Sequence, residues 1–202
     1  ARITVTDEEG DVTELNLQLN SDGYVEFCNS IDHAGTPDAD EFTWEMEYDT
    51  EGHLVVMKRS ESDGEITNIT YKDGDVVKTS TRYVASGDFN GDGIIDSNDE
   101  WEYSAAIDYT TDNITAPIEN KGCLMLFDEI LDVDMDEMIY VYYGGMLGKA
   151  TKHLPLAGHY TYNGEDSVSD MYFTWTLNSD SYPTELVVKD QWDEYRLSLI
   201  HI

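Results

Sequence analysis

Apolar and polar residues alternate with a period of two along several segments of this chain. In residues 14–19 every second residue is a leucine, and in residues 44–48 an aromatic residue or methionine alternates with glutamate. Successive side chains of a β-strand point to opposite faces of the sheet, so this period indicates half-buried strands. One apolar face and one wet face are typical of antiparallel sheets.

Short turn signals separate the alternating segments. Asp-Gly, Glu-Gly or Asn-Gly pairs close the segments 21–23, 49–52, 62–64, 72–74 and 163–164. Such pairs favour tight hairpin turns, and they predict a meander of hairpins from Phe42 to Ser80. We therefore expect a mainly β fold: a curved antiparallel sheet or open barrel of hairpins with one or two short helices. The length favours a single domain, 1–202, with a loop insertion at 88–108.

Helical spacing occurs in two places. Asp99 is placed to cap a short helix that carries Trp101, Ala105 and Ile107 on its inner side. The second is the segment from Leu126 to Met138, where apolar residues recur at helical spacing. Both are predicted to be short helices within a chain that is otherwise β.

A short sequence repeats within the chain. Phe42-Thr-Trp44 is followed by a turn and Leu54-Val-Val56, and Phe173-Thr-Trp175 is followed by a turn and Leu186-Val-Val188. Two equivalent binding walls would give this pattern, but we favour two similar hairpins in one sheet, because two copies are too few for a solenoid.

Residues 88–99 have the pattern of a twelve-residue calcium loop. Oxygen-bearing side chains stand at loop positions 1, 3, 5, 9 and 12, and glycine stands at position 6. Ca²⁺ takes six to eight oxygen ligands from such a loop. The predicted ligands are the side chains of Asp88, Asn90, Asp92 and Asp99, the backbone carbonyl of Ile94, and Asp96 directly or through water.

The loop differs from a calcium sensor. Asp99 replaces the usual terminal Glu, and its shorter side chain predicts weaker binding. Residues 81–84 resemble a strand, so the entering helix is missing, as is a second complete loop. The loop resembles the repeats of dockerin modules, which also end in Asp, although those modules carry two repeats. A lone weak site fills only near millimolar calcium, so we expect an extracytoplasmic location.

The charge excludes some partners. The chain has 43 acidic and 11 basic residues and a formal net charge of −32, which would repel nucleic acid and anionic lipid surfaces. A solvated surface is the simplest explanation for so much acid, and attraction of cations or basic partners is the alternative. No segment has the roughly 18 apolar residues of a spanning helix. We expect a monomer. Cys28 and Cys123 allow one disulfide or, as we slightly favour, two thiols.

Three other motifs fail on spacing. Asp132-Val-Asp134-Met-Asp136 begins like a second calcium loop, but Glu137 stands where glycine is needed, which favours a turn or helix end with solvated carboxylates. Residues 144–151 lack the spacing and the Ser or Thr of a phosphate loop. His153 and His159 are six residues apart, which fits ordinary histidines better than a zinc site.

Residues 119–127, 131–138 and 142–155 carry sequence blocks that resemble a family of secreted gut-bacterial domains of unknown function, described as having a porin-like fold. The hairpins at 48–54 and 71–74 are similar to the tyrosine-and-glycine hairpins of that family. The resemblance implies a lipoprotein of the cell envelope, with an antiparallel sheet or open barrel wrapped on a helix, and it implies no activity. Glutamates on one strand face argue against a membrane-spanning barrel.

These observations favour a non-enzymatic module, secreted or lipid-anchored in the cell envelope, that one calcium ion stabilises. Its ligand is unknown, and a glycan or peptide is a candidate because aromatic residues could stack on either. A carboxylate-dependent hydrolase acting on glycan or peptide is the first alternative, which two acids converging in a pocket with perturbed pKa values would favour. A structural subunit of a surface complex is the second.

Overall fold

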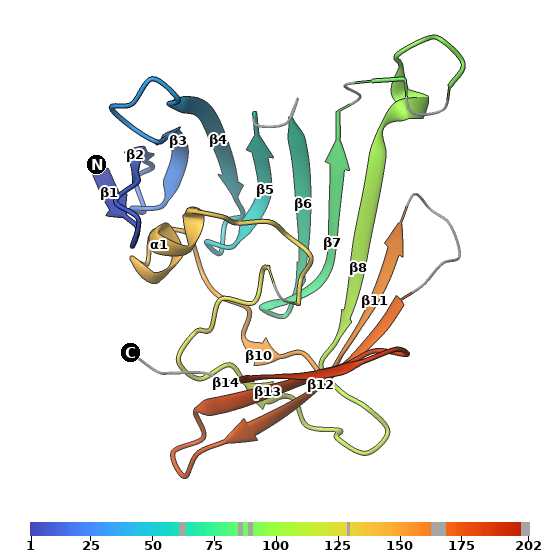
Figure 1. Cartoon of the computed structure of the whole chain (residues 1–202). Helices are drawn as coiled ribbons and strands as arrows, with labels where there is room; N and C mark the ends of the chain where they lie inside the picture. Colours follow the sequence, from blue (N-terminus) through green and yellow to red (C-terminus); the bar gives the residue numbers. More distant parts are fainter. Residues whose placement is uncertain (61–63, 85–86, 89–90, 129, 163–168, 199–202) are drawn as a thin grey trace. The chain divides into compact units, whose positions relative to one another are not determined.

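A computed structural model describes residues 1–60, 64–84, 87–88, 91–128, 130–162 and 169–198 of this chain. Its main feature is one large antiparallel sheet of twelve strands that is not closed, with the strand order β1-β2-β3-β4-β5-β6-β7-β8-β11-β12-β13-β14 (Figure 1). The predicted fold class, mainly β with an antiparallel sheet of hairpins and a short helix, is confirmed.

The first eight strands follow each other along the chain. They are β1 (Arg2–Thr6), β2 (Val12–Leu19), β3 (Val25–Asp32), β4 (Asp40–Tyr48), β5 (Leu54–Arg59), β6 (Glu65–Lys72), β7 (Asp75–Tyr83) and β8 (Trp101–Asp108). The remaining elements are the short 3₁₀ helix η2 (Ser97–Asp99), the helix α1 (Met138–Tyr143), the small β9–β10 sheet (Ile118–Glu119 and His153–Leu154), and β11 (Ala157–Tyr162), β12 (Ser169–Leu177), β13 (Pro183–Lys189) and β14 (Glu194–Ser198).

Contacts group the chain into two compact units. Unit 1 contains Ala1–Asn68, Thr81–Trp101 and Met135–Lys149, and unit 2 contains Ile69–Ser80, Glu102–Asp134 and Ala150–Ile202. We describe each unit by itself. Since the sheet runs through both, this division does not decide between one domain and two, and the single domain stays a prediction.

The core of unit 1 follows the predicted alternation. Leu15 and Leu17 of β2 and Trp44 and Met46 of β4 are buried, while Glu45 and Glu47, which alternate with them in β4, are exposed. Leu19 is exposed because a β-bulge shifts the register at the end of β2. Helix α1 buries Met138 and Val141. The chain after it is held to the turns of the sheet by backbone hydrogen bonds from Val25 to Met146 and from Lys149 to Gly52.

The core of unit 2 is built from strands and from an irregular segment that precedes α1. The strand residues include Val76, Ala105, Ile107, Phe173 and Leu186. The irregular segment buries a further set of apolar residues, namely Leu126, Phe127, Ile130, Leu131 and Val133. Irregular backbone thus supplies a large share of this core.

The turn signals are confirmed where the structure describes them. Asp73 and Gly74 both have positive φ, 56° and 90°, as a type I′ hairpin turn requires. The repeated Phe-Thr-Trp segments form the β4–β5 and β12–β13 hairpins of the same sheet, which confirms the favoured interpretation. Part of the 62–64 turn and all of the 163–164 turn lie outside the described residues.

The two helix predictions are wrong in position. Residues 101–108 form strand β8, because alternate residues of this segment face the core and it pairs with β11. The described residues of 126–137 form turns and irregular backbone, in which Asp132 and Asp136 adopt left-handed φ values of 53° and 37° that interrupt a helix. The helix begins only at Met138.

Both cysteines are thiols, as slightly favoured from the sequence: Cys28 is buried and Cys123 is exposed. Among the described residues, no helix is both long enough and apolar enough to cross a membrane.

Candidate functional site

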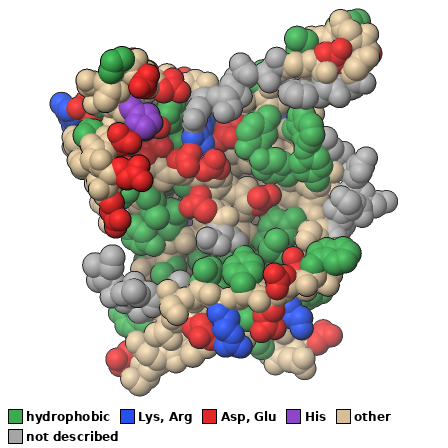
Figure 2. Space-filling view, in the orientation of Figure 1, with side chains coloured by type: hydrophobic (Ala, Val, Ile, Leu, Met, Phe, Trp, Pro, Cys, Tyr) green, Lys and Arg blue, Asp and Glu red, His purple; other side chains and the backbone are tan. Residues whose placement is uncertain are grey.

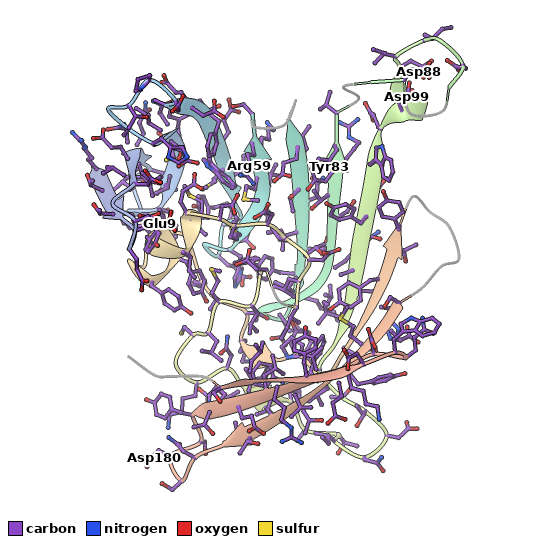
Figure 3. The ribbon with its side chains drawn as sticks, viewed as in Figure 1. Glu9, Arg59, Tyr83, Asp88, Asp99 and Asp180 are labelled. Carbon is purple, nitrogen blue, oxygen red and sulfur yellow. The ribbon has the colours of Figure 1, made fainter. Side chains whose placement is uncertain are left out.

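The predicted calcium loop connects β7 to β8, and Asp88 and Asp99 lie on this connection (Figure 3). The Asp88 carboxylate accepts three backbone N–H groups, from Gly91 at 2.7 Å, from Gly93 at 2.8 Å and from Asp92 at 3.0 Å. Gly93 has φ of +85°, which a residue with a Cβ rarely adopts. Asp88, the first residue of the loop, therefore holds the turn together through its carboxylate.

The far end of the loop is anchored in the protein. Asp99 lies in η2, is only 1% exposed, and accepts the backbone N–H of Asp96 at 3.0 Å. Asp92 accepts the N–H of Ile94 at 2.8 Å. Asn90 lies outside the described residues. Within the described part of the chain, no group of three or more His, Cys, Asp or Glu side chains is gathered closely enough to hold a metal ion. In the described residues, the loop thus has a turn folded at Asp88 and a buried end at Asp99, without a closed set of carboxylates.

A pocket of about 380 Å³ lies in unit 1, and we call it the arginine pocket. Its lining comes from β1, β2, β5, the turn after β3 and the start of α1, and consists of Val5, Asp7, Asp11, Thr13, Asp32, His33, Arg59, Asp136, Glu137, Ile139 and Tyr140. Arg59 is the last residue of β5 (Figure 3) and is 8% exposed.

Arg59 contacts two aromatic rings and the Asp136 carboxylate. Its guanidinium carbon lies 4.7 Å from the Trp44 ring centroid and 5.2 Å from that of Phe42, within the range of cation–π attraction. The guanidinium also forms an ion pair with Asp136. A buried cation needs such compensation, since its transfer from water is costly.

Glu137 also has its charge engaged within the protein. Its carboxylate accepts the Trp44 indole N–H at 2.9 Å, although Glu137 occupies the N-cap position of α1 and forms no side-chain cap there. Burial raises the pKa of Glu137, and the hydrogen bond from Trp44 opposes this effect. Burial of Cys28, together with the charge of Glu137, raises the pKa of the Cys28 thiol to about 12, so this thiol is unreactive.

A second pocket, of about 370 Å³, lies in unit 2, and we call it the tyrosine pocket. Its lining residues are Tyr103, Asp132, Tyr160, Thr161, Tyr162 and Ser169. Tyr162 of β11 pairs directly with Tyr103 of β8, and their nearly parallel rings have centroids 6.1 Å apart with an angle of 15°. The two rings stack beside each other, and both line the pocket.

The third tyrosine is fixed by its own strand. The Tyr160 ring lies back over Gly158, where a Cβ would approach the phenol oxygen to 2.5 Å, so only glycine leaves room for it. Its hydroxyl donates to the Ile130 carbonyl at 2.6 Å. Burial, followed by the charge of Asp132, raises the pKa of Tyr160, so the phenol stays neutral.

Asp132 is a residue that sequence reasoning missed. Its segment was expected to carry solvated carboxylates, but Asp132 is half-buried and burial raises its pKa. Asp136, in the same segment, forms the ion pair with Arg59. The left-handed backbone at both residues is a tertiary feature that no spacing rule predicts, although an Asp between buried Leu131 and Val133 was a usable signal.

The two histidines considered for zinc bind aspartates instead. His153 Nδ1 lies 2.8 Å from Asp75, and His159 lies 2.7 Å from Asp170 and 3.2 Å from Asp108. The hydrogen bond with Asp170 is the main cause that raises the pKa of His159. Each imidazole therefore forms hydrogen bonds with aspartates of the protein, as expected for ordinary histidines.

The repeated tryptophans have unlike environments. Trp44 is fully buried and donates to the Glu137 carboxylate, whereas Trp175 is half-buried and donates to the Pro155 carbonyl at 2.7 Å. They do not form two equivalent binding walls. Acidic side chains cover much more of the face seen in Figure 2 than basic ones, in agreement with the net charge of −32.

The described residues form an open antiparallel sheet of twelve strands with a short helix, which places the chain in the class of β-rich domains. The chain belongs to the family described as "Domain of unknown function (DUF4595) with porin-like fold", whose model matches residues 1–185. This confirms the resemblance found in the sequence, as far as the family and its fold.

Solved structures agree on the fold. A porin-like protein from Bacteroides vulgatus ATCC 8482 is similar to this chain with a TM-score of 0.66 and 16% identity, covering 98% of this chain and 84% of that one. A porin-like protein from Bacteroides uniformis ATCC 8492 is similar with a TM-score of 0.61 and 20% identity, covering 96% and 70%. No curated protein is significantly similar to this chain.

Proposed function

We propose that this chain is a non-enzymatic binding or structural module of the cell envelope or of the secreted space, in which one calcium ion closes the β7–β8 connection. The observation that carries the proposal is the Asp88 carboxylate, which accepts three backbone N–H groups within the turn. A tight turn gathered around the first carboxylate supports a calcium loop, because the oxygen ligands of such a loop must converge from a short segment.

The residues present fit a calcium ion in kind. Asp88, Asp92 and Asp99 offer carboxylates, Ile94 offers a carbonyl, and hard oxygen ligands are what Ca²⁺ prefers. With Asp96, the loop holds four like charges within a short turn, and their repulsion opposes closure. A bound divalent cation would supply the compensating charge. Asn90 would be a further ligand.

A calcium titration followed by thermal unfolding tests the proposal. A lone loop ending in Asp should have a Kd near 10⁻³ M, as other extracellular sites do. At about 10 mM Ca²⁺ the stabilisation is then ~1.4 kcal/mol. For a chain of this size that corresponds to a rise in Tm of about 3–6 °C. Chelator should reverse the rise.

The matched variants are Asp92→Ala, within the loop, and Asp112→Ala, at an exposed position outside it. Asp92→Ala should abolish the calcium-dependent rise and Asp112→Ala should keep it. Equal melting curves of the wild type with calcium and with chelator would remove the metal from the proposal.

The location follows from the affinity. A site with a millimolar Kd is filled outside the cytoplasm, where calcium is abundant, and stays empty within it. A lipid anchor or secretion would place the domain there. Fractionation of the producing cells, with antibody detection of the full-length protein in envelope, culture medium and cytoplasm, tests this point, and a purely cytoplasmic protein would contradict it.

The hydrolase alternative receives one specific observation, the raised pKa of Glu137 in a pocket that Asp32 also lines. Two contacts speak against it. Glu137 is engaged by the Trp44 indole and Asp136 by Arg59. We therefore expect no turnover of common glycan and peptide substrates. A robust activity that Glu137→Gln abolishes, while the folded protein persists, would establish the alternative.

A further inference from the structure

We infer that the tyrosine pocket binds an organic cation, an alkylammonium group, against the Tyr103 and Tyr162 rings with Asp132 as its counter-ion. This inference rests on the proposal that the chain is a binding module, and it names the ligand class and the site. The family description names no such site.

The aromatic surface is the first argument. The faces of tyrosine rings carry a negative quadrupole that attracts a cation within about 6 Å of the ring centre. The Tyr103 and Tyr162 rings are nearly parallel and neighbouring, with centroids 6.1 Å apart. Tyr162 is 39% exposed, so a ligand can reach this surface from solvent.

The charge of Asp132 is the second argument. Burial is the cause that raises its pKa, and no lysine, arginine or histidine among the described residues forms an ion pair with it. Partial burial of a carboxylate without a cationic partner costs free energy. A ligand cation would remove that cost. A neutral sugar or alcohol would supply hydrogen bonds without the charge.

The pocket is also held in place before any ligand arrives. The Tyr160 hydroxyl donates to the Ile130 carbonyl and the Thr79 hydroxyl to the Leu131 carbonyl, each at 2.6 Å. These two carbonyls precede Asp132, so the backbone that carries the carboxylate is fixed on one side. A fixed site loses less conformational entropy on binding. Its volume of about 370 Å³ lies in the range of small-molecule sites.

The first experiment compares a cation with its neutral isostere. Choline and 3,3-dimethylbutan-1-ol have nearly the same shape and differ in the charge of the head group. We expect choline to bind the intact chain and the alcohol to bind at least about tenfold more weakly, as measured by calorimetry and saturation-transfer NMR. Equal binding of the two, or binding of neither, overturns the inference. A peptide with one trimethyllysine distinguishes a free cation from a side chain as the source.

The variants separate the two arguments. Asp132→Asn removes the charge, and Asn accepts the left-handed φ of +53° at this position. Tyr103→Leu removes one ring. Each should weaken choline binding by about tenfold. Asp134→Asn, an exposed acid two residues away, and Tyr172→Leu, an exposed tyrosine outside the pocket, are the matched controls and should bind choline as the wild type does.

Titration of Asp132 provides a readout that folding effects do not imitate. Choline should lower the pKa of the Asp132 carboxyl, measured by carbon NMR, and choline affinity should fall as pH drops through that pKa. An unchanged pKa in saturating choline overturns the inference. Choline binding by the wild type, together with equal melting curves in calcium and in chelator, would refute the calcium proposal alone. A calcium effect without choline binding would refute the inference alone.

Discussion

Gly148→Ala should destabilise this protein far more than Gly145→Ala, although both residues have left-handed backbones. Their φ values are +79° and +72°. A Cβ at Gly145 meets nothing within 4 Å, whereas a Cβ at Gly148 would lie 2.7 Å from the Gly52 carbonyl oxygen and 3.0 Å from the Tyr48 ring. The pair thus separates backbone strain from close contact within one short segment.

The magnitudes follow from these contacts. An alanine in the left-handed region costs about 1 kcal/mol at either position. At Gly148 the overlap with backbone adds about 1–3 kcal/mol. The hydrogen bond from Lys149 N–H to the same Gly52 oxygen, 2.9 Å long, is strained as well and adds about 1 kcal/mol. We expect about 3–5 kcal/mol for Gly148→Ala and about 1 kcal/mol for Gly145→Ala.

Thermal unfolding and urea titration measure the difference. For a chain of this length Tm should fall by about 10 °C or more in Gly148→Ala and by about 3 °C in Gly145→Ala. Equal losses in the two variants would refute the close approach of the segment after α1 to the β4–β5 turn. The same result would remove the structural reason for glycine in a segment that superficially resembles a phosphate loop.

Three further predictions concern single contacts. His159→Gln should cost a few tenths of a kcal/mol of stability, because the ring is 43% exposed and water screens its two aspartate partners. Since the folded pKa of His159 is raised, this loss should be full below about pH 6.5 and should vanish as pH rises through the folded pKa. Urea titrations below and above this pH range measure the trend, and a loss that grows with pH would contradict it. Trp44→Phe should lower the free energy of unfolding by about 1–3 kcal/mol, because it removes the hydrogen-bond donor to Glu137. The loss should grow as pH rises through the raised pKa of Glu137, because the donor favours the ionised carboxylate. A loss that does not change with pH would contradict this. Gly158→Ala should displace the Tyr160 ring, and an unchanged aromatic NMR spectrum would show that the ring does not lie over the glycine.

Much of the sheet was predictable from local patterns. Alternation fixes which face of a strand is buried, as at Trp44 and Met46, and a pair such as Asp73-Gly74 determines a tight turn by its own backbone preferences. These properties depend on neighbouring residues in the chain. They survive in any fold that contains the hairpin.

Segments with mixed patterns were not predictable in this way. Residues 101–108 carry apolar residues compatible with a helix, but β11 offers a strand to pair with, and that pairing decides the conformation. The segment before α1 was expected to be a helix, yet Asp132 and Asp136 take left-handed conformations that distant contacts hold in place. Local propensity is worth too little to outweigh such contacts.

The sequence by itself determined the β class of this protein, its hairpins, its family and the residues of a candidate calcium loop, because each depends on residue types at fixed short spacing. Only the tertiary structure decided which acidic side chains are partly buried and which groups they contact. Glu137 and Asp132 are two of the 43 acidic residues, and burial raises the pKa of each; the Glu137 carboxylate accepts the Trp44 indole N–H, while Asp132 lines a pocket with three tyrosines. Burial and partners depend on residues far away in the chain, and that is why no pattern of neighbours contains them.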